Sequence, residues 1–85
     1  MSMNDPLVAE QVAEMLVRSQ AAKQKGALAT AKKLEADMQR FIQNEQFEGN
    51  VPDPDGLMRE VTNNIVNKYP QHLPALLGVD VEGLQ

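Results

Sequence analysis

Few side chains in this sequence are of the types that carry out covalent or acid–base chemistry. Cysteine is absent, and the serine hydroxyls are those of Ser2 and Ser19. Ser19 falls in an apolar helical stripe, where a small residue allows helices to pack closely. The single histidine, His72, lies between Pro70 and Pro74, with no acid and nucleophile around it to form a catalytic set. We therefore expect a surface or capping histidine, no catalytic residue, and a protein that is not an enzyme.

One short segment has part of the pattern of a metal-binding loop. Asp53, Asp55 and Gly56 match the third, fifth and sixth positions of a calcium-binding helix–loop–helix motif. The first and twelfth positions would be Val51 and Thr62, which lack the carboxylates that complete the oxygen shell. A zinc-binding histidine pair is excluded, because the chain has one histidine. We expect no bound metal, and we interpret Asp53 as the cap of a helix.

The glycines do not form a phosphate-binding loop. Gly26 is isolated, and Gly49 and Gly56 do not belong to a glycine-rich turn between a strand and a helix. A small, acidic, helical chain is similar to an acyl carrier protein, but that family needs a serine at the start of a helix to carry its phosphopantetheine arm. Here the corresponding position, between Asp55 and Leu57, is a glycine. We therefore expect no cofactor.

The charge balance limits the partners. The 12 acidic and 8 basic residues give a net charge of −4, whereas nucleic-acid-binding domains usually carry a concentrated positive face. The one local basic excess consists of Lys23, Lys25, Lys32 and Lys33, and no aromatic side chain lies among them to stack on a base. We interpret these lysines as a solvated helix end, with a phosphate-binding patch as the alternative, and expect no nucleic-acid partner.

Size and composition favour one small helical domain over residues 1–85. Hydrophobic residues make up 42% of the chain, but aromatic residues are limited to Phe41, Phe47 and Tyr69. The free energy gained by burying so small a core is close to the cost in conformational entropy that it must offset. We therefore expect association with a partner or with itself. No apolar run approaches the roughly 20 residues that span a bilayer, so we expect no membrane partner. The absence of cysteine and of a secretory signal predicts a cytoplasmic protein, or part of an assembly built in the cytoplasm.

The apolar stripe along the first half of the chain changes phase at Gly26. It consists of Val8, Val12, Met15 or Leu16, Ser19 and Ala22 before this glycine, and of Leu28, Ala31, Leu34, Met38, Phe41 and Ile42 after it. One straight helix would face these two halves in different directions. The sequence therefore predicts two helices, 6–25 and 27–46, that fold back on each other as a hairpin. The alternative is one long helix in which Gly26 costs about 1 kcal/mol relative to alanine.

Local signals place the helix ends. Asp5 followed by Pro6 is typical of a helix start, and Asp53 followed by Pro54 repeats the pattern, whereas Ala27 is a poor cap. The remaining expected elements are a linker at 47–54, a helix at 55–69, a short turn at 74–77 and a tail at 79–85. The fold class is all-α: a small helical bundle made of a helical hairpin, a third amphipathic helix and a short C-terminal helical turn.

The segment from Lys23 to Ala31 resembles the turn between the two helices of a tetratricopeptide hairpin. In that family a glycine ends the first helix and an alanine five residues later packs against it, and Gly26 and Ala31 have this spacing. A similar hairpin opens the three-helix domains that bind helical peptides in membrane-trafficking proteins. The resemblance covers fewer than half of the residues and a single copy of the motif. It supports a turn at Gly26 rather than membership of the family.

These features predict that the protein works by contact rather than by chemistry. We expect a non-enzymatic protein–protein interaction module, acting as a small assembly, adaptor or structural subunit that self-associates. The alternative is a regulator or inhibitor that docks on a larger enzyme or transcription complex. The expected main packing set is Val12, Leu16, Leu34, Met38 and Phe41. The residues expected to complete the core or to face a protein partner are Met58, Val61, Ile65, Tyr69, Leu73, Leu76 and Leu77.

Overall fold

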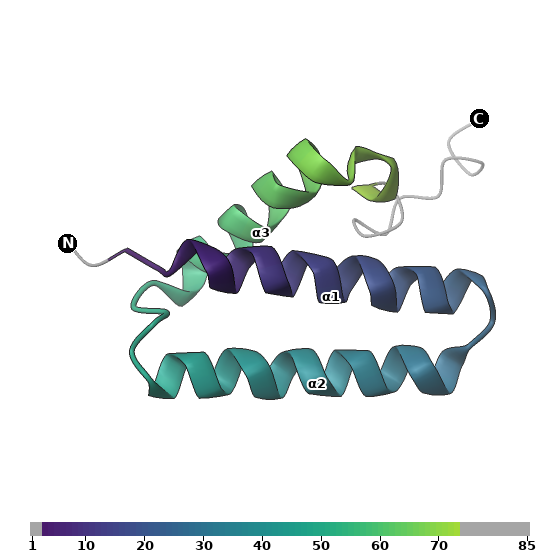
Figure 1. Ribbon diagram of the computed structural model, residues 1–85, viewed down its shortest axis with the longest axis horizontal. Helices are drawn as coiled ribbons and strands as arrows, with labels where there is room; N and C mark the ends of the chain where they lie inside the picture. Colours follow the sequence, from purple (N-terminus) through teal and green to yellow (C-terminus); the bar gives the residue numbers. More distant parts are fainter. Residues whose placement is uncertain (1–2, 74–85) are drawn as a thin grey trace.

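Two antiparallel helices and a third helix that packs obliquely against the first form the fold (Figure 1). The computed structural model describes residues 3–73. Its elements are α1 (Pro6–Gln24), α2 (Leu28–Phe47), α3 (Pro54–Lys68) and the short 3₁₀ helix η1 (Pro70–His72). The chain reverses between α1 and α2, so the predicted hairpin is confirmed and the alternative of one long helix is wrong. Within the described residues no helix is both long enough and apolar enough to span a bilayer.

The start of α1 follows from its first two residues. The carboxylate of Asp5 accepts a hydrogen bond from the backbone N–H of Leu7 at 3.0 Å, which satisfies a donor that the helix itself leaves free. Pro6 occupies the first helical turn, where its missing N–H removes no hydrogen bond. This is the arrangement expected from the Asp-Pro pair.

The turn between α1 and α2 is built around Gly26, whose φ of +80° lies in the left-handed region. Its N–H donates to the carbonyl of Lys23 at 3.0 Å, and the N–H of Ala27 donates to the carbonyl of Ala22 at 2.9 Å. These two bonds form a Schellman motif, which satisfies the last carbonyls of α1. The helix ends at Gln24, one residue before the expected boundary, because the residue before the glycine already serves as the cap.

The end of α2 has the same motif. Gly49 has a φ of +83°, and its N–H donates to the carbonyl of Gln46 at 3.1 Å. The N–H of Asn50 donates to the carbonyl of Glu45 at 2.9 Å. The helix runs to Phe47, one residue past the expected 27–46, because this second Schellman motif lies within the segment expected as a linker. The start of α2 at Leu28 has no side-chain cap.

The third helix is capped as predicted. The carboxylate of Asp53 accepts from the N–H of Gly56 at 3.1 Å, and Pro54 is the first residue of α3. The helix ends at Lys68, and Tyr69 leads into η1, which the sequence did not indicate. The turn expected at 74–77 and the tail at 79–85 lie outside the described residues.

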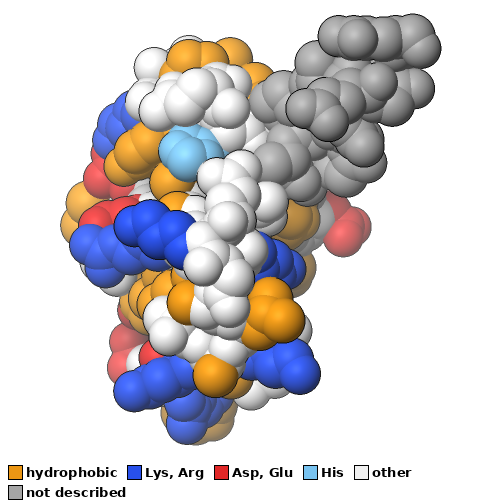
Figure 2. Space-filling view, turned by 90° about the vertical axis from the view of Figure 1, so that its right-hand side faces the viewer, with side chains coloured by type: hydrophobic (Ala, Val, Ile, Leu, Met, Phe, Trp, Pro, Cys, Tyr) orange, Lys and Arg blue, Asp and Glu red, His pale blue; other side chains and the backbone are white. Residues whose placement is uncertain are grey.

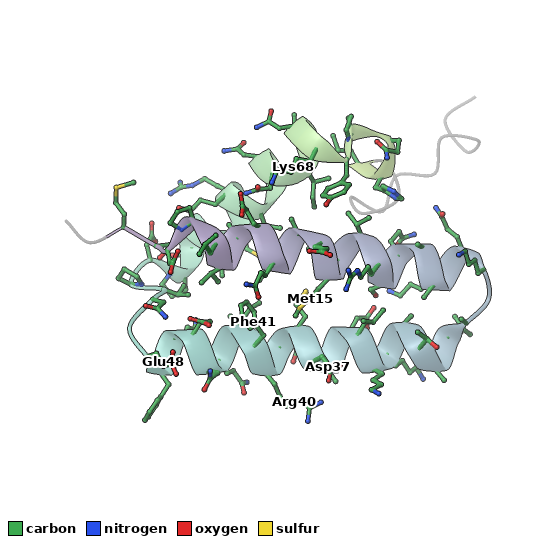
Figure 3. The ribbon with its side chains drawn as sticks, viewed as in Figure 1. Met15, Asp37, Arg40, Phe41, Glu48 and Lys68 are labelled. Carbon is green, nitrogen blue, oxygen red and sulfur yellow. The ribbon has the colours of Figure 1, made fainter. Side chains whose placement is uncertain are left out.

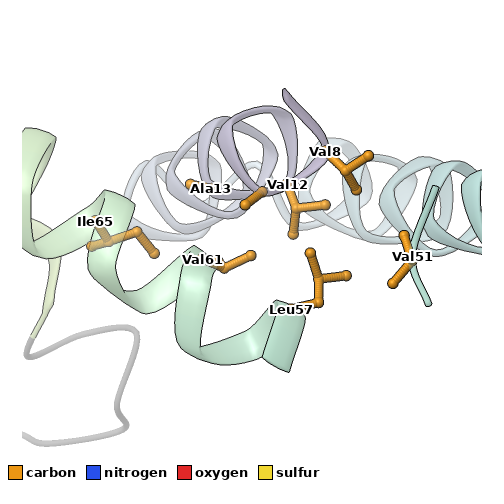
Figure 4. Packing of buried hydrophobic residues seen from close by; sticks show 8 residues of the cluster. Val8, Val12, Ala13, Val51, Leu57, Val61 and Ile65 are labelled. Carbon is orange, nitrogen blue, oxygen red and sulfur yellow. The ribbon is translucent and has the colours of Figure 1, made fainter. Parts of the chain in front are cut away.

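The buried core lies mainly where α3 crosses the first half of α1 (Figure 4). Its members are small or medium aliphatic residues: Val8, Ala9, Val12, Ala13, Val51, Leu57, Val61 and Ile65. Of the expected main packing set only Val12 is fully buried. Leu16, Met38 and Phe41 are partly buried against this core, and Leu34 is half-buried outside it. The centre shifts away from the hairpin because the small Ala9 and Ala13 let α3 approach α1 closely.

Two apolar residues that were candidates for the core are exposed. Leu28 was expected in the stripe of the second helix, but its side chain is 60% exposed because it begins α2 beyond the contact with α1. Met58 was expected either to complete the core or to face a partner, and at 56% exposure it does not belong to the core. It follows the buried Leu57 by one position, which turns its side chain about 100° around the helix axis.

Candidate interaction surface

Ser19, one of the residues considered for chemistry, takes part in the packing of the hairpin. Ser19 is buried between α1 and α2, and its hydroxyl donates to Oε1 of Glu35 at 3.2 Å. The same carboxylate pairs with Nζ of Lys23 at 2.6 Å. The hydrogen bond and the charge of Lys23, with smaller contributions from the hydrogen bond of Ser19 and the charge of Lys32, lower the pKa of Glu35 from its ordinary value. Ser19 thus links the two helices, in agreement with its interpretation as a small packing residue.

The acidic residues around the start of α3 are arranged as helix caps. Oδ1 of Asp53 is engaged by the N–H of Gly56, and Oδ2 lies 3.9 Å from the guanidinium of Arg59. Asp55 is exposed in the first turn, where a negative charge favours the helix dipole. Residues 3–73 contain no group of three or more histidine, cysteine or acidic side chains placed to hold a metal ion. His72 is half-buried in η1.

The predicted partner-facing residues fall into three groups. Val61 and Ile65 are buried between α3 and α1, so they complete the core and are not available to a partner. Tyr69 and Leu73 are partly buried against the same core. Met58 is exposed on α3. The last two, Leu76 and Leu77, lie outside the described residues.

Asn4 is a structural residue that sequence reasoning missed. It is 5% exposed, and its side-chain amide pairs with the backbone of Asp53: Nδ2 donates to the carbonyl at 2.7 Å, and Oδ1 accepts from the N–H at 2.8 Å. Nδ2 also donates to Oε2 of Glu60 at 3.0 Å. The backbone N–H of Asp5 adds a bond of 2.9 Å to the carbonyl of Asn50. These bonds hold the start of α1 to the linker before α3.

This linkage brings four exposed apolar side chains to one end of the molecule, opposite the Gly26 turn. We call it the open end: α1 and α3 begin there and α2 ends there (Figure 1). Phe47 is 91% exposed and Met3 is 85% exposed, and Leu7 and Met58 are each more than half exposed. Large apolar side chains exposed at one end of a small domain are candidates for a contact surface.

Charge is also distributed by end. The turn end, defined by the last turn of α1 and the first two turns of α2, carries Lys23, Lys25, Lys32 and Lys33 with the single acid Glu35. Figure 2 looks onto this end and shows Lys and Arg side chains spread around apolar groups, with some Asp and Glu side chains toward the edges of the view. Within the seven residues of each helix nearest to it and the adjoining segments, the open end carries seven acids, Asp5, Glu10, Glu45, Glu48, Asp53, Asp55 and Glu60, with the single base Arg59. Glu48 marks the end of α2 in Figure 3.

The charges of α2 oppose its helix dipole. A helix is favoured by acidic residues near its N-terminus and basic residues near its C-terminus. In α2 the lysines Lys32 and Lys33 follow the first turn, while Glu45 lies in the last turn and Glu48 is the cap. The charge separation between the two ends is therefore not a by-product of stabilising this helix.

Two shallow depressions lie on α3. One, of about 330 Å³, is lined by Met58, Arg59, Thr62 and Asn63. The other, of about 260 Å³, lies between α1 and α3 and is lined by Pro6, Ala9, Glu10, Glu60, Asn63 and Asn64. Their sizes are at or below the lower limit of small-molecule sites. The larger depression includes the exposed Met58 and extends the apolar surface of the open end along α3.

Comparison with protein-family models, curated proteins and solved structures finds no match for this chain. The tetratricopeptide resemblance remains one of a single turn, in which Gly26 is left-handed and Ala31 is buried. Function has to be argued from the surface alone.

Proposed function

We propose that this protein is a non-enzymatic protein–protein interaction module, a small assembly, adaptor or structural subunit that associates with itself. The observation that carries the proposal is the exposed apolar cluster of the open end, above all Phe47 at 91% exposure. The sequence has two phenylalanines, and one of them is held out in solvent at the end of a well-formed helix. The free energy of such a side chain is lowered when another surface covers it. We further propose that the protein acts in the cytoplasm or in an assembly built there.

The size of the cluster fits a contact surface. Covering one large apolar side chain yields about 1.5–3 kcal/mol, whereas association costs about 4–15 kcal/mol in lost freedom of motion. One exposed side chain would not hold a complex together. Four at one end, namely Met3, Leu7, Phe47 and Met58, reach the range in which a contact becomes stable.

A second candidate is a regulator or inhibitor that docks on a larger protein. It is favoured by the carboxylates around the same apolar cluster, among them Glu48 and Asp55, which would suit an apolar groove with a basic rim. This candidate also requires no catalytic residue. It predicts a monomer that binds one host protein.

Light scattering coupled to gel filtration, across a wide range of protein concentration, tests the proposal. A mass that rises with concentration supports a self-associating subunit. A constant monomer mass, with one protein recovered in stoichiometric amounts by affinity capture from the native cell, supports the regulator. A monomer that captures no protein overturns both candidates. Phe47→Ser is the matched variant, since removal of this exposed side chain weakens association or capture while helix content by circular dichroism stays unchanged.

A further inference from the structure

We propose that copies of this chain associate head to tail, the turn end of one copy contacting the open end of the next. The inference rests on the self-association proposed above and names the two surfaces that make it. The partner of each end is thus a second copy of the same chain, and the contact joins two different surfaces, the turn end and the open end.

Both ends combine exposed apolar side chains with charge, and the charges are opposite. At the turn end Leu28 is 60% exposed and lies among Lys25, Lys32 and Lys33. At the open end Phe47 and the other apolar side chains occur among the seven carboxylates already described. An apolar centre with a rim of complementary charge is the usual anatomy of a protein–protein contact.

The charges of the two ends are available to another molecule. Among residues 3–73, Lys25, Lys32 and Lys33 form no ion pair, and neither do Glu48 and Asp55. The 20 residues of α2 separate the two ends by about 30 Å, several times the screening length of about 8 Å at physiological ionic strength. The ends therefore do not neutralise each other within one molecule. They attract only when two molecules meet.

The same distribution disfavours symmetric contacts. Two turn ends would bring lysines against lysines, and two open ends would bring carboxylates against carboxylates. A contact between unlike patches leaves one patch free on each molecule, so association continues beyond a dimer into a closed ring or an open filament. An antiparallel side-by-side pair would also match opposite charges. It would stop at a dimer, however, and would leave Leu28 and Phe47 at the tips of the molecules uncovered.

Charge reversal tests the inference. One variant carries Lys25→Glu, Lys32→Glu and Lys33→Glu, which makes both of its ends acidic. The other carries Glu48→Lys and Asp55→Lys, which makes its open end less acidic and locally basic. Mass is measured by sedimentation velocity at ionic strengths of about 0.01 M and 1 M, where the Debye length is about 30 Å and 3 Å. Circular dichroism verifies that each variant is folded.

We expect the wild-type mass to exceed that of a dimer at low ionic strength and to fall at high ionic strength. Each reversed variant alone loses this association. An equal mixture of the two regains contact between unlike copies, because the unchanged acidic open end of the first variant meets the unchanged basic turn end of the second. The control carries Arg18→Glu and Arg40→Glu, which reverse exposed charges midway along α1 and α2. It keeps the wild-type association.

The remaining outcomes contradict the inference. Association that survives both reversals, that stops at a dimer, or that the mixture fails to restore would overturn the head-to-tail contact while leaving self-association itself intact. A wild-type protein that stays monomeric at low ionic strength would overturn the head-to-tail contact and the proposed self-association together.

Discussion

Asn4 shows how one short polar side chain can join two segments that are far apart in the sequence. Its amide reproduces the donor and acceptor of a backbone group opposite Asp53. Because the side chain is buried, its removal leaves the N–H of Asp53 without a partner, whereas the carbonyl of Asp53 still accepts from the N–H of Leu57. Unpaired buried polar groups cost about 1–3 kcal/mol each, more than the bond contributes when it is made.

We therefore expect Asn4→Ala to lower the free energy of unfolding by about 1–3 kcal/mol, mainly from the unpaired N–H of Asp53. Asn4→Asp should be no milder at neutral pH, since a carboxylate cannot donate to the carbonyl of Asp53 and would face Glu60. Urea unfolding followed by circular dichroism measures both. Asn63→Ala, at an exposed position of α3, is the control and should change stability little. Equal stability of the Asn4→Ala protein and the wild type would contradict the role of Asn4 in joining the two segments.

Glu35 predicts a pH dependence of stability. The hydrogen bond from Lys23 and its charge lower the pKa of Glu35 in the folded protein. A carboxylate whose folded pKa is depressed stabilises the protein at pH values above its unfolded pKa, and this contribution is lost as the pH falls through the folded pKa. Glu35→Gln should therefore lower the melting temperature at pH 7, and the difference from wild type should disappear in acid. Thermal unfolding between neutral and acidic pH measures it, and a difference that persists unchanged in acid would contradict the prediction.

Ser19 and Asn4 differ in how far their roles could be predicted from the sequence. The close packing of Ser19 follows from its place in an apolar period, which is a local pattern. Asn4 gives no such signal, because its partner Asp53 lies 49 positions away and becomes its neighbour only when α3 folds across α1. Its role depends on tertiary structure, so periodicity and capping rules do not reach it.

Among the elements, the hairpin turn was the best determined by sequence. Gly26 needs its left-handed φ, and the space around a Cβ there is open, so a substitution is penalised by backbone strain alone. We expect Gly26→Ala to destabilise the protein by about 1–2 kcal/mol, and Gly26→Asn to cost less, because asparagine tolerates this conformation better. Chemical denaturation measures both. A more stable Gly26→Ala protein would indicate that the turn is not held in this conformation.

The third helix was less well determined, for a physical reason. Its cap at Asp53 and its buried face could be predicted from local signals. Which face of α1 it covers could not, because Ala9 and Ala13 make up part of that face, and alanine occurs on exposed and buried faces alike. The expected main packing set was therefore drawn from the two helices of the hairpin, whereas the buried core also includes Leu57, Val61 and Ile65 of α3.

At the scale of the whole molecule, two large apolar residues of similar hydrophobicity, Leu57 and Phe47, have opposite roles. Leu57 is 3% exposed in the core, and Phe47 is almost fully exposed at the open end. Hydrophobicity alone does not distinguish them. The distinction arises because α2 ends at Phe47 and the chain turns away at Gly49, so nothing within the described residues packs over that side chain.

This contrast gives a test that separates folding from contact. Leu57→Ala opens a cavity in the core and should lower the free energy of unfolding by about 2–5 kcal/mol, a large share of the roughly 4–13 kcal/mol expected for a chain of this length. Phe47→Ser should change monomer stability by no more than about 0.5 kcal/mol, because an exposed side chain has few contacts to lose. It should nevertheless weaken association, which light scattering at matched protein concentrations would detect. If Phe47→Ser instead destabilised the monomer as strongly as Leu57→Ala, the exposed phenylalanine would belong to the fold, and the open end would lose its main argument as a contact surface.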